Sequence, residues 1–321
     1  MAPAREDDDD LILRAEQHHA REEYILAADL LKQVDDVSAL KDKHKRIIGM
    51  ADRARLVREV LLRPPEEGWI KQGETHGHRD TAIYYKVNPD DTSILCRIET
   101  PIEQSLLIPL ISVLNESELF TSWMPSFKHP KLGVQSADKL KEMGRGNQII
   151  DVMIAMPIGF SRRQCIQHAF AVNSIRDDNA IIIKAESKDT GTFDDELEIP
   201  PPARGVVRVD FDAGFLIRPC PSDHPLLRAS NVDYHGESMI LLSVTQTMNA
   251  HVGYVPMALV NFFTRIVLGR MWGSLLAVAE GVRDGQREAH AQAIAEKEEL
   301  YKWVEEQILI MFDRMEEAKT A

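Results

Sequence analysis

The chain has 321 residues, of which 44% are apolar and 28% charged, the composition of an ordinary globular protein rather than a disordered one. Its formal net charge of −13 argues against a nucleic-acid-binding protein and against one that bulk charge holds on anionic lipid. The acidic N-terminus lacks the basic start and apolar core of a signal peptide. Together with three widely separated cysteines, which favour a reducing compartment, this predicts a cytoplasmic protein.

The first part of the chain is expected to be helical. Residues 11–62 contain no proline and one glycine, and they are rich in Ala, Leu, Glu, Lys and Arg, which predicts two or three helices. Pro64 and Pro65 end this stretch, because proline lacks a backbone donor and clashes with the preceding turn. We therefore assign residues 1–65 to an N-terminal helical extension.

The pattern changes after Trp69 from helical to alternating. Residues 81–87 and 93–99 alternate around the turn signal NPDD, which predicts a hairpin. A helical stretch over 102–123 follows, and Pro109 is expected to kink or divide it. Further strands are predicted, with the spacing of an antiparallel meander, over residues 147–156, 164–172, 179–187, 205–218 and 238–249.

One strand and one helix together indicate the architecture. The strand near residue 210 is apolar on one face, so that face must be covered; it carries Val207, Val209, Phe211, Ala213, Phe215 and Ile217. Residues 253–276 form a helix-like run that is apolar nearly all round, and two arginines interrupt it too early for a membrane span. The predicted fold class is α+β: a helix-grip fold, in which a curved antiparallel sheet of about seven strands wraps around a long C-terminal helix, with extra helices at both termini.

Three segments carry a resemblance to a known family. "GWIKQGE" followed by "IYYKV" is similar to the opening strands of START (steroidogenic acute regulatory-related lipid transfer) domains. A Leu-Asn-Glu-x-x-Leu-x-x-Trp pattern, with one extra residue before Trp, is matched by Leu114, Asn115, Glu116, Leu119 and Trp123. A signature segment follows the last strand of the family's domains, and it is matched here by Gly253, Val255, Pro256, Val260 and Asn261. The resemblance covers residues 66–283, and it departs at Arg162-Arg163, where many relatives carry Arg-Asp.

The resemblance implies a soluble lipid-binding or lipid-transfer protein that encloses one lipid in an apolar tunnel between sheet and helix. The ligand would be a sterol, a phospholipid or a sphingolipid, and membrane contact would be transient. The resemblance implies no catalytic residue, no cofactor and no metal. Alternatives are a helix-grip cyclase or hydrolase acting on a bulky apolar substrate, with Asp151 and His168 as its only candidate pair, and a scaffold that has lost its ligand.

Candidate lipid-binding residues follow from the predicted faces. Alternation places His168 on the same face as Phe170, and this face is expected to point inward; Asp151 lies in the neighbouring strand and would pair with His168 as a polar anchor. For His168 the alternative is a satisfied core histidine, and for the methionines ordinary core filling. The predicted lining is Asp151, Met153, His168, Phe170, Val209, Phe211, Phe215, Val260, Phe263, Val267 and Met271.

Two further segments are expected to make contacts outside the core. The loop with Ile158, Phe160, Arg162 and Arg163 matches a family loop at the tunnel mouth, and its apolar tip flanked by arginines suits membrane docking. The alternative is a tight turn whose Phe packs inward. Residues 284–321 are expected to hold a C-terminal amphipathic helix that binds a partner protein, lies on a membrane or docks within the molecule; the N-terminal helices are likewise candidates for a protein partner.

Overall fold

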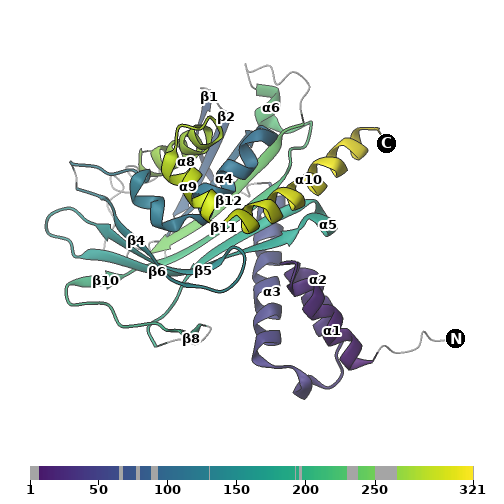
Figure 1. Ribbon diagram of the computed structural model, residues 1–321. Coiled ribbons are helices and arrows are strands. Elements are labelled where there is room, and N and C mark those ends of the chain that lie inside the picture. The colour runs from purple at the N-terminus through teal and green to yellow at the C-terminus, as the bar shows by residue number, and fades with distance from the viewer. Residues whose placement is uncertain are drawn as a thin grey trace.

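The computed structural model describes residues 7–64, 68–76, 80–87, 93–129, 131–191, 193–194, 197–229, 238–249 and 266–320. Within these ranges the chain is built on one large sheet with helices on both faces (Figure 1), as expected for the α+β class. No helix in these ranges combines the length and the apolar character needed to cross a membrane.

The sheet has ten strands, where about seven were predicted. Nine follow the order β1-β2-β3-β12-β11-β7-β6-β5-β4, and β10 pairs with β6 beside this path. The strands are β1 (Ile70–His76), β2 (Asp80–Val87), β3 (Ile94–Ile102), β4 (Gly133–Glu142), β5 (Asn147–Ala155), β6 (Arg162–Ser174), β7 (Ala180–Ser187), β10 (Val206–Arg208), β11 (Asp210–Pro219) and β12 (Ile240–Asn249). Two short strands, β8 (Phe193–Asp194) and β9 (Leu197–Glu198), pair separately.

Strand pairing follows the predicted meander with one exception. The predicted hairpin is confirmed, because β2 and β3 pair antiparallel. The predicted strand over 205–218 is divided, and its first part, β10, runs parallel to β6 instead of antiparallel. Strand β4, which pairs antiparallel with β5, was not predicted.

The N-terminal segment forms three helices on one face of the sheet, which confirms the prediction of two or three. They are α1 (Asp8–His19), α2 (Tyr24–Leu31) and α3 (Asp42–Leu62), and they lie below the sheet in Figure 1. Buried residues on α3 recur every three or four positions, the period of one helix face: Ile47, Met50, Ala51, Ala54, Val57 and Leu61. This face shares a core with Phe170, Val172, Ala180, Ile182 and Leu216 of the sheet, so the outer face is covered here.

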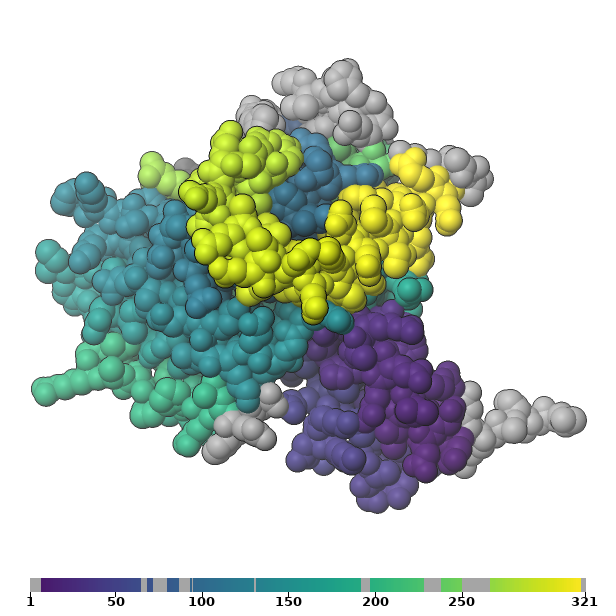
Figure 2. All heavy atoms as spheres, in the orientation of Figure 1, coloured from purple at the N-terminus to yellow at the C-terminus, as the bar shows by residue number. Residues whose placement is uncertain are grey.

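The other, inner face of the sheet holds the larger core. Its helical segments are η2 (Gln104–Leu106), α4 (Leu107–Asn115), η3 (Ser117–Ser122), α5 (Ile175–Asp178), α8 (Leu268–Arg283), α9 (Glu288–Glu296) and α10 (Glu298–Thr320), whereas α6 (Pro225–Ala229) lies beside β2 and β3. Side chains of α4, α8 and α10 pack in this core against β3, β5, β11 and β12. Figure 2 shows α9 and α10 lying across α4 and the sheet, on the side away from the N-terminal helices.

Two predictions about the helices are corrected. Pro109 does not divide the helix over 102–123, since it lies in the first turn of α4, where a missing backbone donor has no partner to lose. The chain instead leaves the α-helical path at Glu116, between α4 and η3.

The predicted covering helix over 253–276 falls partly outside the described residues, which resume at Ile266. Its described part belongs to α8, which continues to Arg283. Trp272, Leu275 and Leu276 of α8 are buried in the inner core, and Trp272 Nε1 donates a hydrogen bond to Thr100 Oγ1 of β3 at 2.8 Å. The described part of this helix therefore covers the sheet as predicted.

Candidate functional site

A pocket of about 100 Å³ lies on the inner side of the sheet, between α4, strands β6 and β7, and α10. Apolar side chains from all of these elements form its walls: Ile111, Leu114, Ala169, Ile181, Ile183 and Val304. Polar side chains also border it, among them Glu22, Asn115, Arg145, Gln148, Asn173 and Gln307. An apolar pocket edged by a few polar groups is the usual form of a small-molecule site.

Small residues in β6 help to create the pocket. Inward positions of β6 alternate with outward ones, and Ala169 and Ala171 take inward positions that border the pocket. Across the gap, α10 contributes Leu300, Trp303 and Val304. Two successive alanines opposite large helix side chains leave volume that a larger residue in β6 would fill.

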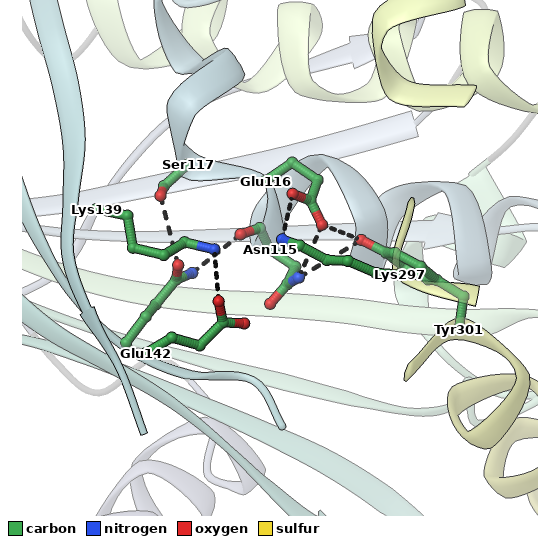
Figure 3. A network of polar contacts seen from close by, with 8 residues as sticks. Asn115, Glu116, Ser117, Lys139, Glu142, Lys297 and Tyr301 are labelled. Atoms are coloured by element: carbon green, nitrogen blue, oxygen red, sulfur yellow. Dashed lines mark hydrogen bonds and ion pairs between the residues drawn. The ribbon is translucent and has the colours of Figure 1, made fainter. Parts of the chain in front are cut away.

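A buried polar network joins the walls beside the pocket (Figure 3). The Glu116 carboxylate, at the end of α4, accepts a hydrogen bond from Tyr301 Oη at 2.6 Å and lies 2.6 Å from Lys297 Nζ. Asn115 Nδ2 donates to Glu116 Oε1 at 3.0 Å, and Gln148 Nε2 donates to the Asn115 carbonyl at 3.0 Å. The network thus ties α10 and the residue before it to α4 and β5.

The charge state of Glu116 follows from this network. Burial by itself would raise the pKa of Glu116, but Lys297, Tyr301 and Asn115 together hold it below its ordinary value. The pKa of Tyr301 is raised, chiefly by burial and also by the neighbouring carboxylate. Glu116 is therefore ionised at neutral pH and acts as the charged centre of the contact.

The attachment of α10 is expected to weaken in acid. Because the folded-state pKa of Glu116 lies below its ordinary value of 4.5, its contribution is present above pH 4.5 and is lost as the pH falls through the folded pKa. The protection factors of residues 298–320, which correct the hydrogen-exchange rates for the slower intrinsic exchange in acid, should fall over this window when measured between pH 6 and 3. The Glu116→Gln variant serves as the control; it should exchange faster at pH 6 and respond less to acid, and an unchanged acid response in this variant would contradict the assignment.

The structure confirms the predicted faces of β11. Val209, Phe211 and Phe215 belong to the inner core, while Leu216 packs toward the N-terminal helices. None of the three inner residues borders the described pocket. Met271 packs with Tyr85 in a small separate cluster, and Val267 is partly buried just before α8. Val260 and Phe263 lie outside the described residues.

The predicted faces of β5 and β6 are wrong. Ile150 and Val152 of β5 and Cys165 of β6 point into the inner core, so their neighbours point outward. Asp151, Met153, His168 and Phe170 consequently lie on the outer face. The Phe170 ring packs under α3, although the residue also borders the pocket.

Asp151 and His168 do not form the predicted polar anchor. Asp151 Oδ2 accepts a hydrogen bond from Gln164 Nε2 at 2.7 Å, and burial raises the pKa of this carboxyl. His168 Nε2 lies 2.7 Å from Asn147 Oδ1. Asp151 and His168 thus contact different residues and do not form the pair on which a cyclase or hydrolase mechanism depended.

The loop between β5 and β6 is exposed at its tip. The side chain of Ile158 is fully exposed and that of Phe160 is 49% exposed, so the alternative in which this Phe packs into the core is wrong. Arg162 is exposed as well. Arg163 is buried, and its Nη1 donates to the Ser161 carbonyl at 2.6 Å, which removes it from the predicted docking surface.

Several solved structures have a similar fold, and the names of some of them refer to lipid transfer. No family model matches the sequence, and no significant match to a curated protein was found. Human STARD10 aligns at a TM-score of 0.50 and 14% identity over 73% of this chain and 81% of its own. Human StAR-related lipid transfer protein 5 aligns at a TM-score of 0.49 and 16% identity, covering 72% and 97%. A STAR-related lipid transfer protein fragment from Xanthomonas axonopodis aligns at 0.46 and 18%, covering 67% and 99%.

The likeness to STARD10 extends to most of both chains, and at 14% identity it establishes the fold alone. The inserted α4, the curved antiparallel sheet and the helices across its inner face agree with it. The chain therefore has a helix-grip fold like that of human STARD10.

Proposed function

We propose that this protein binds a lipid, a sterol, phospholipid or sphingolipid, and carries it between membranes. The observation that supports this most is the apolar pocket on the inner face of a START-like fold. Burying acyl or ring carbons there removes them from water, at about 0.8 kcal/mol for each CH₂ group. No covalent step is needed, and the separation of Asp151 from His168 leaves the enzyme alternative without its catalytic pair.

The test is to identify what the purified full-length protein carries. Native mass spectrometry followed by organic extraction should find an intact lipid at up to one molecule per chain. The Ala169→Phe variant fills the pocket from β6 and should reduce the bound lipid about tenfold, because the added ring occupies pocket volume. Ala203→Phe places the same ring on an exposed loop and is the matched control. Protein that is empty in the wild type, or Ala169→Phe protein that carries as much lipid as the wild type, would contradict carriage and favour the scaffold alternative.

The loop between β5 and β6 is the proposed membrane contact. Ile158 and Phe160 are exposed at its tip, and Gly159 between them has a φ of +94°, a value that suits glycine in a tight turn. Arg162 follows and would lie near lipid headgroups, where one cation contributes about 1 kcal/mol at an anionic surface.

Removing the apolar tip is expected to weaken binding to vesicles about tenfold or more. Ile158→Asp combined with Phe160→Asp abolishes the insertion of two apolar side chains, each of which contributes about 1.5–3 kcal/mol when fully buried. Co-sedimentation with vesicles of phosphatidylcholine and phosphatidylserine measures the effect. Val37→Asp, which changes an exposed apolar residue between α2 and α3, is the control and should bind as the wild type does. Equal loss in both proteins would contradict a role for the loop.

A further inference from the structure

Helix α10 is bound to the inner side of the sheet by one apolar stripe. Tyr301, Ile308, Met311 and Met315 are buried, and Val304 is partly buried against the same core. These residues follow one another at three or four positions, so they form a single face of the helix. The amphipathic C-terminal helix predicted from the sequence therefore docks within the molecule.

This docked helix limits the space available to a ligand. Five residues of α10 border the pocket: Leu300, Tyr301, Trp303, Val304 and Gln307. With α10 in place the pocket measures about 100 Å³, whereas ligand sites are usually about 300–1,000 Å³. A whole lipid does not fit unless a wall moves, and α10 is the helix outside the sheet and α4 that contributes most residues to the wall.

The chain has a break at the residue where such a movement would pivot. Helix α9 ends at Glu296 and α10 begins at Glu298, and Lys297 between them has φ −112° and ψ 39°, which is not helical. Domain and lid movements commonly use a few residues at the ends of elements as hinges. Lys297 is also the residue whose ammonium contacts Glu116, so pivot and anchor coincide.

Besides the apolar stripe, α10 is held by polar contacts that water can replace. Besides the Glu116 contacts, Asn173 Nδ2 of β6 donates to Gln307 Oε1 at 3.0 Å, and Arg314 Nη1 donates to the Arg176 carbonyl at 2.5 Å. The Glu116 side chain is 5% exposed and that of Lys297 is 26% exposed. Opening hydrates both charges, and this gain offsets much of the lost attraction, since the net stabilisation by a buried ion pair is small.

We propose that α10 is a displaceable lid, which fills the lipid site of the empty protein and swings out about Lys297 to admit the ligand. The inference rests on the proposed lipid function, and it adds to it the step that controls access. The occupant of the closed site is the apolar stripe of this chain itself, so lipid and α10 compete for the same inner surface. Figure 3 shows the contact that must break first, between Glu116 and the pair Lys297 and Tyr301.

A reversible cross-link tests the lid in the full-length protein. Asn173→Cys with Gln307→Cys, joined by a short reducible bis-methanethiosulfonate reagent, fastens α10 to β6 at a place where the side chains are in contact. Uptake of the fluorescent fatty acyl probe cis-parinaric acid should be at least tenfold slower in the cross-linked protein than in the same protein after reduction. The two single cysteine variants, treated with the same reagent, control for modification of native thiols. Equal uptake rates before and after reduction would overturn the lid.

A second variant tests the opposite direction. Lys297→Met removes the ammonium that contacts Glu116 without changing a residue that borders the pocket. Probe uptake and hydrogen exchange of residues 298–320 should both rise about tenfold. Lys302→Met is the matched control, since Lys302 is exposed and forms its ion pair with Glu298 on α10 itself. Absence of probe uptake by every form, including the reduced and Lys297→Met proteins, would contradict the proposed lipid binding, whereas uptake that ignores the cross-link contradicts the lid alone.

Discussion

Replacing Arg97 with alanine is expected to destabilise the protein by about 3–5 kcal/mol, the usual result of removing one partner from a buried charged pair. Arg97 is buried in β3 and closes the C-terminal end of α3. Its guanidinium donates to the carbonyls of Val60 at 3.2 Å, Leu61 at 3.0 Å and Arg63 at 2.6 Å. These are carbonyls that a helix end leaves without partners, so one side chain satisfies several of them.

The second half of the Arg97 contact is Glu99. Arg97 Nε and Nη2 both donate to Glu99 Oε1, at 3.0 and 2.5 Å. Burial alone would raise the pKa of Glu99, but His224 and Arg97 hold it below its ordinary value. Without Arg97, the buried Glu99 carboxylate has only a weaker partner, and the helix carbonyls lose their donor. Both changes destabilise the junction between α3 and the sheet.

Chemical denaturation of Arg97→Ala should therefore show a lowered midpoint, with α3 exchanging its amide hydrogens before the sheet does. Arg283→Ala is the matched control; its arginine pairs with Asp284 at the surface and should cost less than about 1 kcal/mol. The double variant Arg97→Ala with Glu99→Ala should lose less than the sum of the single variants, because it leaves no buried carboxylate behind. A loss in Arg97→Ala no greater than that in Arg283→Ala would rule out this role.

The sequence was most informative where one local pattern determines one element. The N-terminal helices and the hairpin of β2 and β3 follow from composition, period and turn residues. Strand β4 was not predicted because "GVQSADKLKE" is a largely polar edge strand. Both of its faces are partly exposed to solvent, so its sequence shows little apolar alternation. The short β10 has three residues and pairs parallel with β6 through a long connection, which no local signal reveals.

The faces of β5 and β6 were inverted for a related reason. Alternation of apolar and polar residues identifies the buried face of a strand only when the other face is exposed to solvent. Here Phe170 and Val172 are buried under α3, while Cys165 on the opposite face is buried in the inner core. A strand covered on both sides is apolar on both sides, and the sequence then holds no information about which face is inner. On β11 the prediction succeeded because charged residues such as Asp210 and Asp212 occupy exposed positions of the outer face.

Some features of the pocket can be recognised in the sequence, whereas the contact between its walls cannot. The apolar stripe of α10 and the Asn115-Glu116 motif were both recognisable. Their meeting was not, since Glu116 and Lys297 are 181 residues apart in the chain and contact each other only in the fold. Ala169 and Ala171 were available as a mark of open space in β6, but only once their face was known.

Gly214 of β11 lies in close contact with α3, and Gly214→Val is expected to cost about 2–3 kcal/mol through overpacking. A Cβ atom at this position would lie 2.6 Å from Val57 Cγ2 and 2.7 Å from Val57 Cγ1. Val57 is β-branched and lies in the middle of α3, so its side chain has few other rotamers and cannot turn away without moving the helix. The larger residue in β11 therefore pushes α3 off the sheet.

Denaturation together with limited proteolysis measures both consequences of Gly214→Val: a lower free energy of unfolding, and faster cleavage within residues 7–64. Gly273→Ala is the control, because nothing lies within 4 Å of the added Cβ on α8 and alanine favours a helix, so its stability should be unchanged or higher. The clash also predicts coupling. Gly214→Ala combined with Val57→Ala should lose less stability than the two single variants together, because the shortened side chain on α3 vacates the space that the new methyl group enters. Strictly additive losses would mean that α3 docks on β11 without the close contact at Val57, and that the N-terminal helices are held by Arg97 and the apolar core alone.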